Sequence, residues 1–161
     1  MEIGATKAVQ DRLKTTKIEE SKGASLVFCW DTHLTKIKGR NVLFIVHASN
    51  RYTIAMTDIE QGNWNYYTMY ISRVIHGVML EMGYSEDQIG QYFKMSDDTT
   101  VTKTHGRKSV GGINRMVMDA QYFGKKLEKE ATKILSKYKR NRNTTVTRID
   151  TDKFHFIKPE E

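Results

Sequence analysis

Apolar residues between positions 26 and 56 follow the short, dense pattern of β-strands. One run begins at Leu26–Trp30 and continues through Leu34 and Ile37, and like Val42–Val46 it is rich in β-branched and aromatic residues. Tyr52–Met56 repeats the pattern after a polar turn. A second turn, Lys38–Asn41, precedes the middle run. Short strands divided by such turns indicate an antiparallel meander. Because Val42–Val46 is apolar without interruption, we expect it to be the central strand, covered on both faces.

Two longer stretches instead carry apolar residues every three or four positions, the spacing of a buried helix face. The first runs over Trp64–Met82, with Gly83 where a C-terminal cap belongs. The second runs over Val110–Arg140, with Ser109 as its N-cap. Between them, Ser85–Gln88 has the form of a capping box and predicts a short helix. These helices supply the apolar cover that the sheet needs.

The two ends of the chain complete the expected fold. A short strand is predicted at Glu2–Ala5, and an edge strand at Thr99–Lys103. Near the C-terminus, Thr144–Ile149 and Phe154–Ile157 have the pattern of a hairpin. Neither a repeat nor a low-complexity segment divides the chain. We therefore expect a single α+β domain over residues 1–161: an antiparallel β-meander packed against two longer helices, with a C-terminal β-hairpin.

Charge changes this picture by indicating the kind of partner. The 161 residues include 26 Lys and Arg against 19 Asp and Glu, a net charge of +7, and the basic residues crowd between Thr102 and Arg148. Such a field favours acidic partners, namely nucleic acid, a nucleoprotein complex or an acidic protein face. The alternative is a basic surface that serves only solubility. Without a leader-like start or a long apolar run, the protein is expected to be cytoplasmic.

The basic residues concentrate in a glycine-rich turn and along the helix after it. Backbone N–H groups at a helix start, next to basic side chains, form a seat for a phosphate or carboxylate. The candidate binding residues are Lys103, His105, Arg107, Lys108, Ser109, Lys126, Lys129, Lys133, Lys137 and Arg140. Two alternatives remain open: the turn only starts the helix, and the lysines form a solvated helix face.

Motifs that fix a catalytic chemistry are absent from the sequence. The segment Gly106–Ser109 lacks the full spacing of a phosphate-binding loop, since Arg107 stands where the second glycine is needed. Five scattered histidines include no His-x-x-x-His pair, so neither a metal nor a cofactor is expected. Cys29, the single cysteine, excludes an intrachain disulfide and lies among apolar neighbours, which predicts a buried, inert thiol. His47 and His76 are interpreted as structural.

Four short motifs carry a resemblance to a known family. They are Ala5-Thr6-Lys7, Trp30 with Leu34, Val42-Leu43-Phe44, and Lys108-Ser109-Val110-Gly111-Gly112 at a helix start. With these motifs the chain resembles small proteins of bacteria, phages and other mobile elements that are classed as a domain of unknown function. The resemblance covers roughly Ile3–Phe123 and departs at Lys108, where the family has Arg, and at Asn114-Arg115, where an Asn-Asp pair is usual. It implies a mobile-element context. The basic extension of the last helix and the C-terminal hairpin lie outside the resemblance and are interpreted as additions to the family domain.

Two functional hypotheses follow. The first is a non-enzymatic binding protein of phage or mobile-element type, which engages nucleic acid or a nucleic-acid-processing host complex; inhibition of a defence system is one role that fits it. The alternative is a small nucleic-acid-acting enzyme, such as a toxin-like ribonuclease. There His105 acts as acid or base, Arg107 and Lys108 stabilise phosphate charge, and Tyr92 or Tyr122 assists. The sequence shows no partner base for His105.

Overall fold

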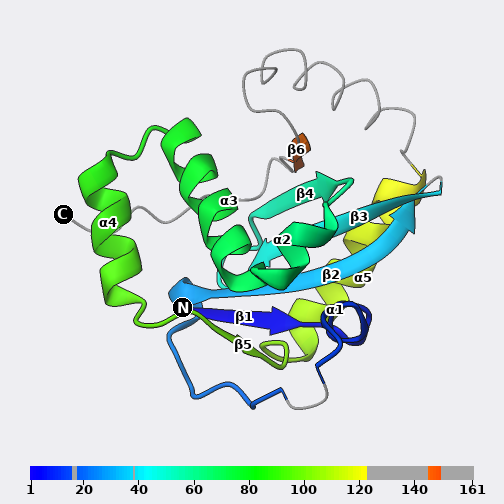
Figure 1. The fold of residues 1–161 in the computed structure, drawn as a ribbon, viewed down its shortest axis with the longest axis horizontal. Coiled ribbons are helices and arrows are strands. Elements are labelled where there is room, and N and C mark those ends of the chain that lie inside the picture. Colours follow the sequence, from blue (N-terminus) through cyan, green and yellow to red (C-terminus); the bar gives the residue numbers. More distant parts are fainter. Residues whose placement is uncertain (16–17, 38, 123–144, 150–161) are drawn as a thin grey trace.

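The computed structural model describes residues 1–15, 18–37, 39–122 and 145–149 of an α+β fold built around one mixed sheet (Figure 1). The strands are β1 (Glu2–Ala5), β2 (Cys29–Ile37), β3 (Arg40–His47), β4 (Thr53–Thr57), β5 (Thr100–Thr102) and β6 (Thr145–Ile149). Their order across the sheet is β5-β1-β2-β3-β4, and β6 pairs antiparallel with the outer edge of β4.

The expected meander is confirmed in β2, β3 and β4, which pair antiparallel in sequence order. The rest of the sheet is a correction, because β1 pairs parallel with β2 and β5 pairs parallel with β1. Parallel neighbours need a crossover connection. Helix α1 (Lys7–Leu13) and the polar segment after it provide that connection between β1 and β2. Local turn signals, which mark hairpins, carry no information about such pairing.

The helical predictions hold in outline and differ at their ends. The stretch Trp64–Met82 forms two helices, α2 (Gln61–Asn65) and α3 (Tyr67–Glu81), because Tyr66 leaves the helical conformation with φ −119° and ψ 41°. Helix α4 (Glu86–Met95) begins with the expected capping box of Ser85 and Gln88. Leu26–Phe28 forms a 3₁₀ turn instead of the start of a strand, with the Phe28 N–H donating to the Ser25 carbonyl at 2.8 Å.

The last helix and the C-terminus are only partly described. Helix α5 (Arg107–Tyr122) begins three residues before the expected start at Val110. Ser109 therefore lies within its first turn and is not its N-cap, contrary to the prediction. The remainder of the predicted helix lies outside the described residues. So does Phe154–Ile157, the second strand of the expected hairpin, whereas the first strand is β6.

The two faces of the sheet have different cover, with α2 and α3 on one side and α5 on the other (Figure 1). On the first face, Leu43 and Ile45 of β3 pack in the larger core with Ile71 and Ile75 of α3. On the second face, the alternate β3 residues Val42, Phe44 and Val46 pack in a smaller core with Ile113 of α5. Both faces of β3 are buried, which confirms it as the central strand of the meander.

Candidate functional site

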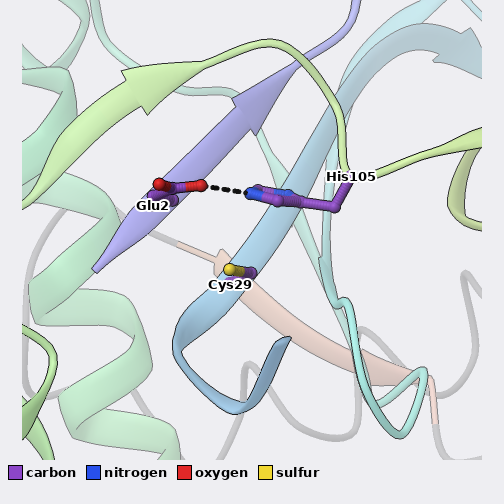
Figure 2. Close-up of side chains that lie close together, drawn as sticks. All are labelled: Glu2, Cys29 and His105. Carbon is purple, nitrogen blue, oxygen red and sulfur yellow. Dashed lines mark hydrogen bonds and ion pairs between the residues drawn. The ribbon is translucent and has the colours of Figure 1, made fainter. Parts of the chain in front are cut away.

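Polar side chains gather on the second face of the sheet, beside the smaller core. Glu2 of β1 lies opposite Cys29 of β2, and Gly4 lies opposite Asp31 in the same parallel register. Because side chains alternate along a strand, these four positions share one face. The turn between β5 and α5 brings His105 over them. Figure 2 shows its ring directed at the carboxylate of Glu2, with the sulfur of Cys29 nearby.

His105 is held by carboxylates at both of its ring nitrogens. The Nδ1 atom lies 2.8 Å from Asp31 Oδ1, and the Nε2 atom lies 2.9 Å from Glu2 Oε2. The backbone N–H of His105 also donates to Asp31 Oδ1, at 3.1 Å. The three side chains are almost fully buried, with exposed fractions of 3% for His105, 6% for Glu2 and 0% for Asp31. This is a buried ionic triad and not a surface ion pair.

Each carboxylate of the triad has further support from the fold. Ser21 Oγ donates to Glu2 Oε2 at 2.6 Å, and the Lys22 backbone N–H donates to Glu2 Oε1 at 2.8 Å. The Asp31 carboxylate occupies space that a side chain on Gly4 would fill, since a Cβ there would lie 1.9 Å from Asp31 Oδ1. Glycine at position 4 thus makes room for the buried charge.

The surroundings of His105 favour its charged form. Burial acts to lower its pKa, but hydrogen bonds with Asp31, Cys29 and Glu2, together with the charge of Asp31, raise the pKa to about 10. Burial acts to raise the pKa of Glu2, and hydrogen bonds from Ser21, His105 and the Lys22 backbone bring it below its usual value. At neutral pH, His105 is therefore an imidazolium that donates both ring protons. Neither ring nitrogen is free to accept a proton.

Cys29 adds a sulfur to this cluster. Its thiol is buried, as expected, and Sγ donates to the Ser25 carbonyl at 3.3 Å. One ligand atom from each of Glu2, Cys29 and His105 lies within 4.8 Å of the other two, which is the arrangement of a candidate metal site. Histidine spacing along the chain did not reveal this cluster, because its members come from three separate segments.

The candidate binding residues divide into those that the structure describes and those outside it. Lys103 is exposed and pairs with Glu20, whereas His105 is buried in the triad. Arg107, Lys108 and Ser109 lie in the first turn of α5. The side chains of these three and all of Lys126, Lys129, Lys133, Lys137 and Arg140 lie outside the described residues. The structure therefore does not bring the basic residues together with His105 into one described surface.

Two further sequence candidates, His47 and Tyr92, have structural roles. His47 contacts Asn50 and the Val27 carbonyl through its two ring nitrogens, at 2.9 and 2.8 Å. The Tyr92 hydroxyl accepts from Trp30 Nε1 at 3.0 Å and donates to the Val27 carbonyl at 2.9 Å. Tyr92 therefore serves the core that α4 covers. The enzyme hypothesis named Tyr92 or Tyr122 as the assisting residue, and the side chain of Tyr122 lies outside the described residues.

Comparison with known proteins gives a family match. No curated protein and no solved structure shows significant similarity to the chain. No helix within the described part of the chain combines the length and the apolar composition that crossing a membrane requires. The family match extends over residues 2–161, so the C-terminal part, which the sequence motifs left as an addition, belongs to the matched region. The chain is thus a member of the family described as domain of unknown function DUF6933.

Proposed function

We propose that the protein is a non-enzymatic binding protein that engages an acidic partner through the basic turn and the basic helix that the sequence predicts after it, within residues 103–140. The observation that carries this proposal is the double hydrogen bonding of His105. Carboxylates occupy both of its ring nitrogens, at 2.8 and 2.9 Å. This arrangement ties the turn to the start of β1 and to β2, so the turn is a fixed support for the start of α5. Support of this kind suits a recognition surface.

The same geometry weighs against the ribonuclease alternative. A general base needs an accepting nitrogen and a pKa near the working pH. His105 has neither, because its pKa is raised to about 10 and carboxylates occupy both of its ring nitrogens. As a general acid, His105 would have to release a proton that one of these buried carboxylates holds. Tyr92, one of the two tyrosines named as assistants, is engaged by Trp30 and Val27. A binding role requires none of these groups to react.

Charge and sequence context support an acidic partner. The net charge of +7 and the density of lysine and arginine after Thr102 raise the local concentration of polyanions. The partner we propose is nucleic acid or a nucleic-acid-processing complex. Within a phage or mobile element, inhibition of a host defence complex is the specific role that this chemistry fits.

The test is binding of labelled single-stranded and double-stranded oligonucleotides to the full chain. The double variant Lys129→Glu with Lys133→Glu should weaken binding at least tenfold, because it changes four units of charge on the proposed surface. Binding by the parent should also fall steeply with added salt, since each neutralised phosphate releases counterions. Fluorescence anisotropy at several salt concentrations measures both effects.

The matched control is Lys36→Glu with Arg73→Glu, which makes the same change in net charge at exposed positions on β2 and α3. The control should bind within twofold to threefold of the parent. If both double variants weaken binding equally, only the overall charge matters and the proposed surface is wrong. Cleavage of RNA that His105→Ala abolishes would instead establish the enzyme.

A further inference from the structure

We propose that Glu2, Cys29 and His105 form a binding site for Zn²⁺. The site would use one carboxylate oxygen, one thiolate sulfur and the His105 Nε2 atom, each from a different segment of the chain (Figure 2). Sulfur, nitrogen and oxygen donors together form the ligand set that Zn²⁺ accepts most readily. This inference is independent of the basic surface and goes beyond the proposed binding function.

The separations between the donor atoms are close to those of a zinc site. Metal–ligand bonds of about 2.0 to 2.3 Å in a tetrahedral arrangement place neighbouring ligand atoms roughly 3.3 to 3.6 Å apart. The His105 Nε2 and Glu2 Oε2 atoms are 2.9 Å apart, and each of the three residues offers one ligand atom that lies within 4.8 Å of a ligand atom of the other two. Shifts on the order of one ångström therefore suffice to admit the ion, which side-chain rotation provides without unfolding the strands.

Neighbouring residues orient the His105 and Glu2 side chains by hydrogen bonds, as the hydrogen-bond partners of metal ligands do in zinc sites. In zinc sites, a ligating histidine usually donates its other ring N–H to a carboxylate, which fixes the ring and its tautomer. Asp31 takes the role of this carboxylate, since its Oδ1 atom lies 2.8 Å from His105 Nδ1. The other ring nitrogen, Nε2, faces Glu2. Glu2 is itself oriented by Ser21 and by the Lys22 backbone. Both ligands are thus supported before any ion enters.

Replacement of protons by the ion leaves the net charge of the cluster unchanged. In the metal-free protein, each ring nitrogen of the charged His105 donates a proton to a carboxylate, and the Cys29 thiol donates to the Ser25 carbonyl. With Glu2 and Asp31 ionised, the cluster carries a net charge of −1. Zn²⁺ would displace the Nε2 proton and the thiol proton to solvent, so two positive charges leave as two enter. A buried site thus accepts the ion without gaining charge, which limits the desolvation cost.

The experiment titrates Co²⁺ and then Zn²⁺ into the full chain after chelator treatment. Co²⁺ bound to a thiolate gives a sulfur-to-metal charge-transfer absorption, and Zn²⁺ should displace it at a stoichiometry of one ion per chain. Zn²⁺ should also raise the thermal midpoint of the parent, because an ion that binds only the folded state stabilises it. Absence of the thiolate absorption from the parent at saturating Co²⁺ overturns the proposal, whether or not any variant folds.

Variants assign the site to its residues. Cys29→Ser should abolish the absorption, and Glu2→Gln should weaken Zn²⁺ binding by tenfold or more. The control is His76→Ala, which removes the exposed pair of His76 Nε2 with Glu86 Oε2, 2.9 Å apart. This surface pair is a competing place for an ion. If His76→Ala removes Zn²⁺ binding, or if Cys29→Ser binds as tightly as the parent, the cluster at Glu2 is not the site.

Discussion

At the scale of single residues, His105 determines how the second face of the sheet is organised. Its ring joins Glu2 and Asp31, which are 103 and 74 positions away along the chain. Removing one member of such a buried group takes away an ionic partner from the residues that stay buried, and this is usually far more destabilising than losing a surface pair. Each of the three residues is therefore expected to be sensitive to substitution.

The first prediction concerns pH. The pKa of His105 is raised from 6.5 to about 10, so the folded state holds its proton more tightly than the unfolded state does. Its contribution to stability is fully present below about pH 6.5 and is lost as the pH rises towards 10. The difference in unfolding free energy between the parent and His105→Gln should therefore shrink over that interval. Denaturant unfolding in the presence of a chelator measures it.

The control for this prediction is Ile75→Ala, which removes packing and no titratable group. Its stability curve should run parallel to that of the parent over the same pH range. A constant difference between the parent and His105→Gln would contradict a proton held by the two carboxylates.

The second prediction concerns Gly4. An added Cβ would lie 1.9 Å from Asp31 Oδ1 and 2.9 Å from the Thr104 backbone, so Gly4→Ala should displace the carboxylate that holds His105. Overpacking of this kind costs about 1–3 kcal/mol. Gly90→Ala in α4 is the control, since a Cβ added there would meet nothing within 4 Å and helical alanine is favoured over glycine. Thermal unfolding of both variants should show opposite shifts, and equal shifts would contradict the assigned role of Gly4.

At the scale of elements, helix α3 shows how apolar spacing translates into burial. Ile71 and Ile75 are 0% and 1% exposed and face the sheet, whereas Val74 is only partly buried at the edge of the same stripe. Spacing alone places all three on one apolar face. How deeply each side chain is buried depends on how far the sheet extends beneath the helix. The sequence of the helix does not encode that extent.

The third prediction follows from this difference in depth. Ile75→Ala should lower the free energy of unfolding by about 2–5 kcal/mol, because it leaves a cavity between α3 and the central strands. Val74→Ala should cost clearly less, since the side chain already contacts solvent. Urea unfolding of the two variants under the same conditions compares them. Equal losses would mean that the helix is rotated about its axis relative to the structure.

At the scale of the molecule, the sheet separates two environments. One face carries the larger apolar core beneath α2 and α3, and the other carries a smaller core beneath α5 together with the buried triad (Figure 1). The proposed Zn²⁺ site lies on the second face, and the turn that supplies His105 leads directly into α5. A substitution or an ion that moves His105 is therefore expected to shift the first turn of α5, where the basic segment begins.

Patterns along the chain predict much of the architecture. Dense apolar runs divided by turns identified β2, β3 and β4, and helical spacing with a capping box identified α3 and α4. These patterns succeed because each element must bury one side, and the period of its apolar residues reports which side that is. The short motifs also indicated the family, which the match over residues 2–161 confirms.

The parallel pairing of β1 and the composition of the site depend on contacts between distant segments, which become visible only in the folded protein. Glu2, Cys29, Asp31 and His105 each look ordinary in their own segments, and no spacing along the chain links Glu2 or His105 to the pair in β2. They meet because the crossover from β1 to β2 and the return through β5 place distant positions in register on one face. Periodicity is a property of neighbouring residues, whereas a buried charge cluster depends on which segments the topology brings together.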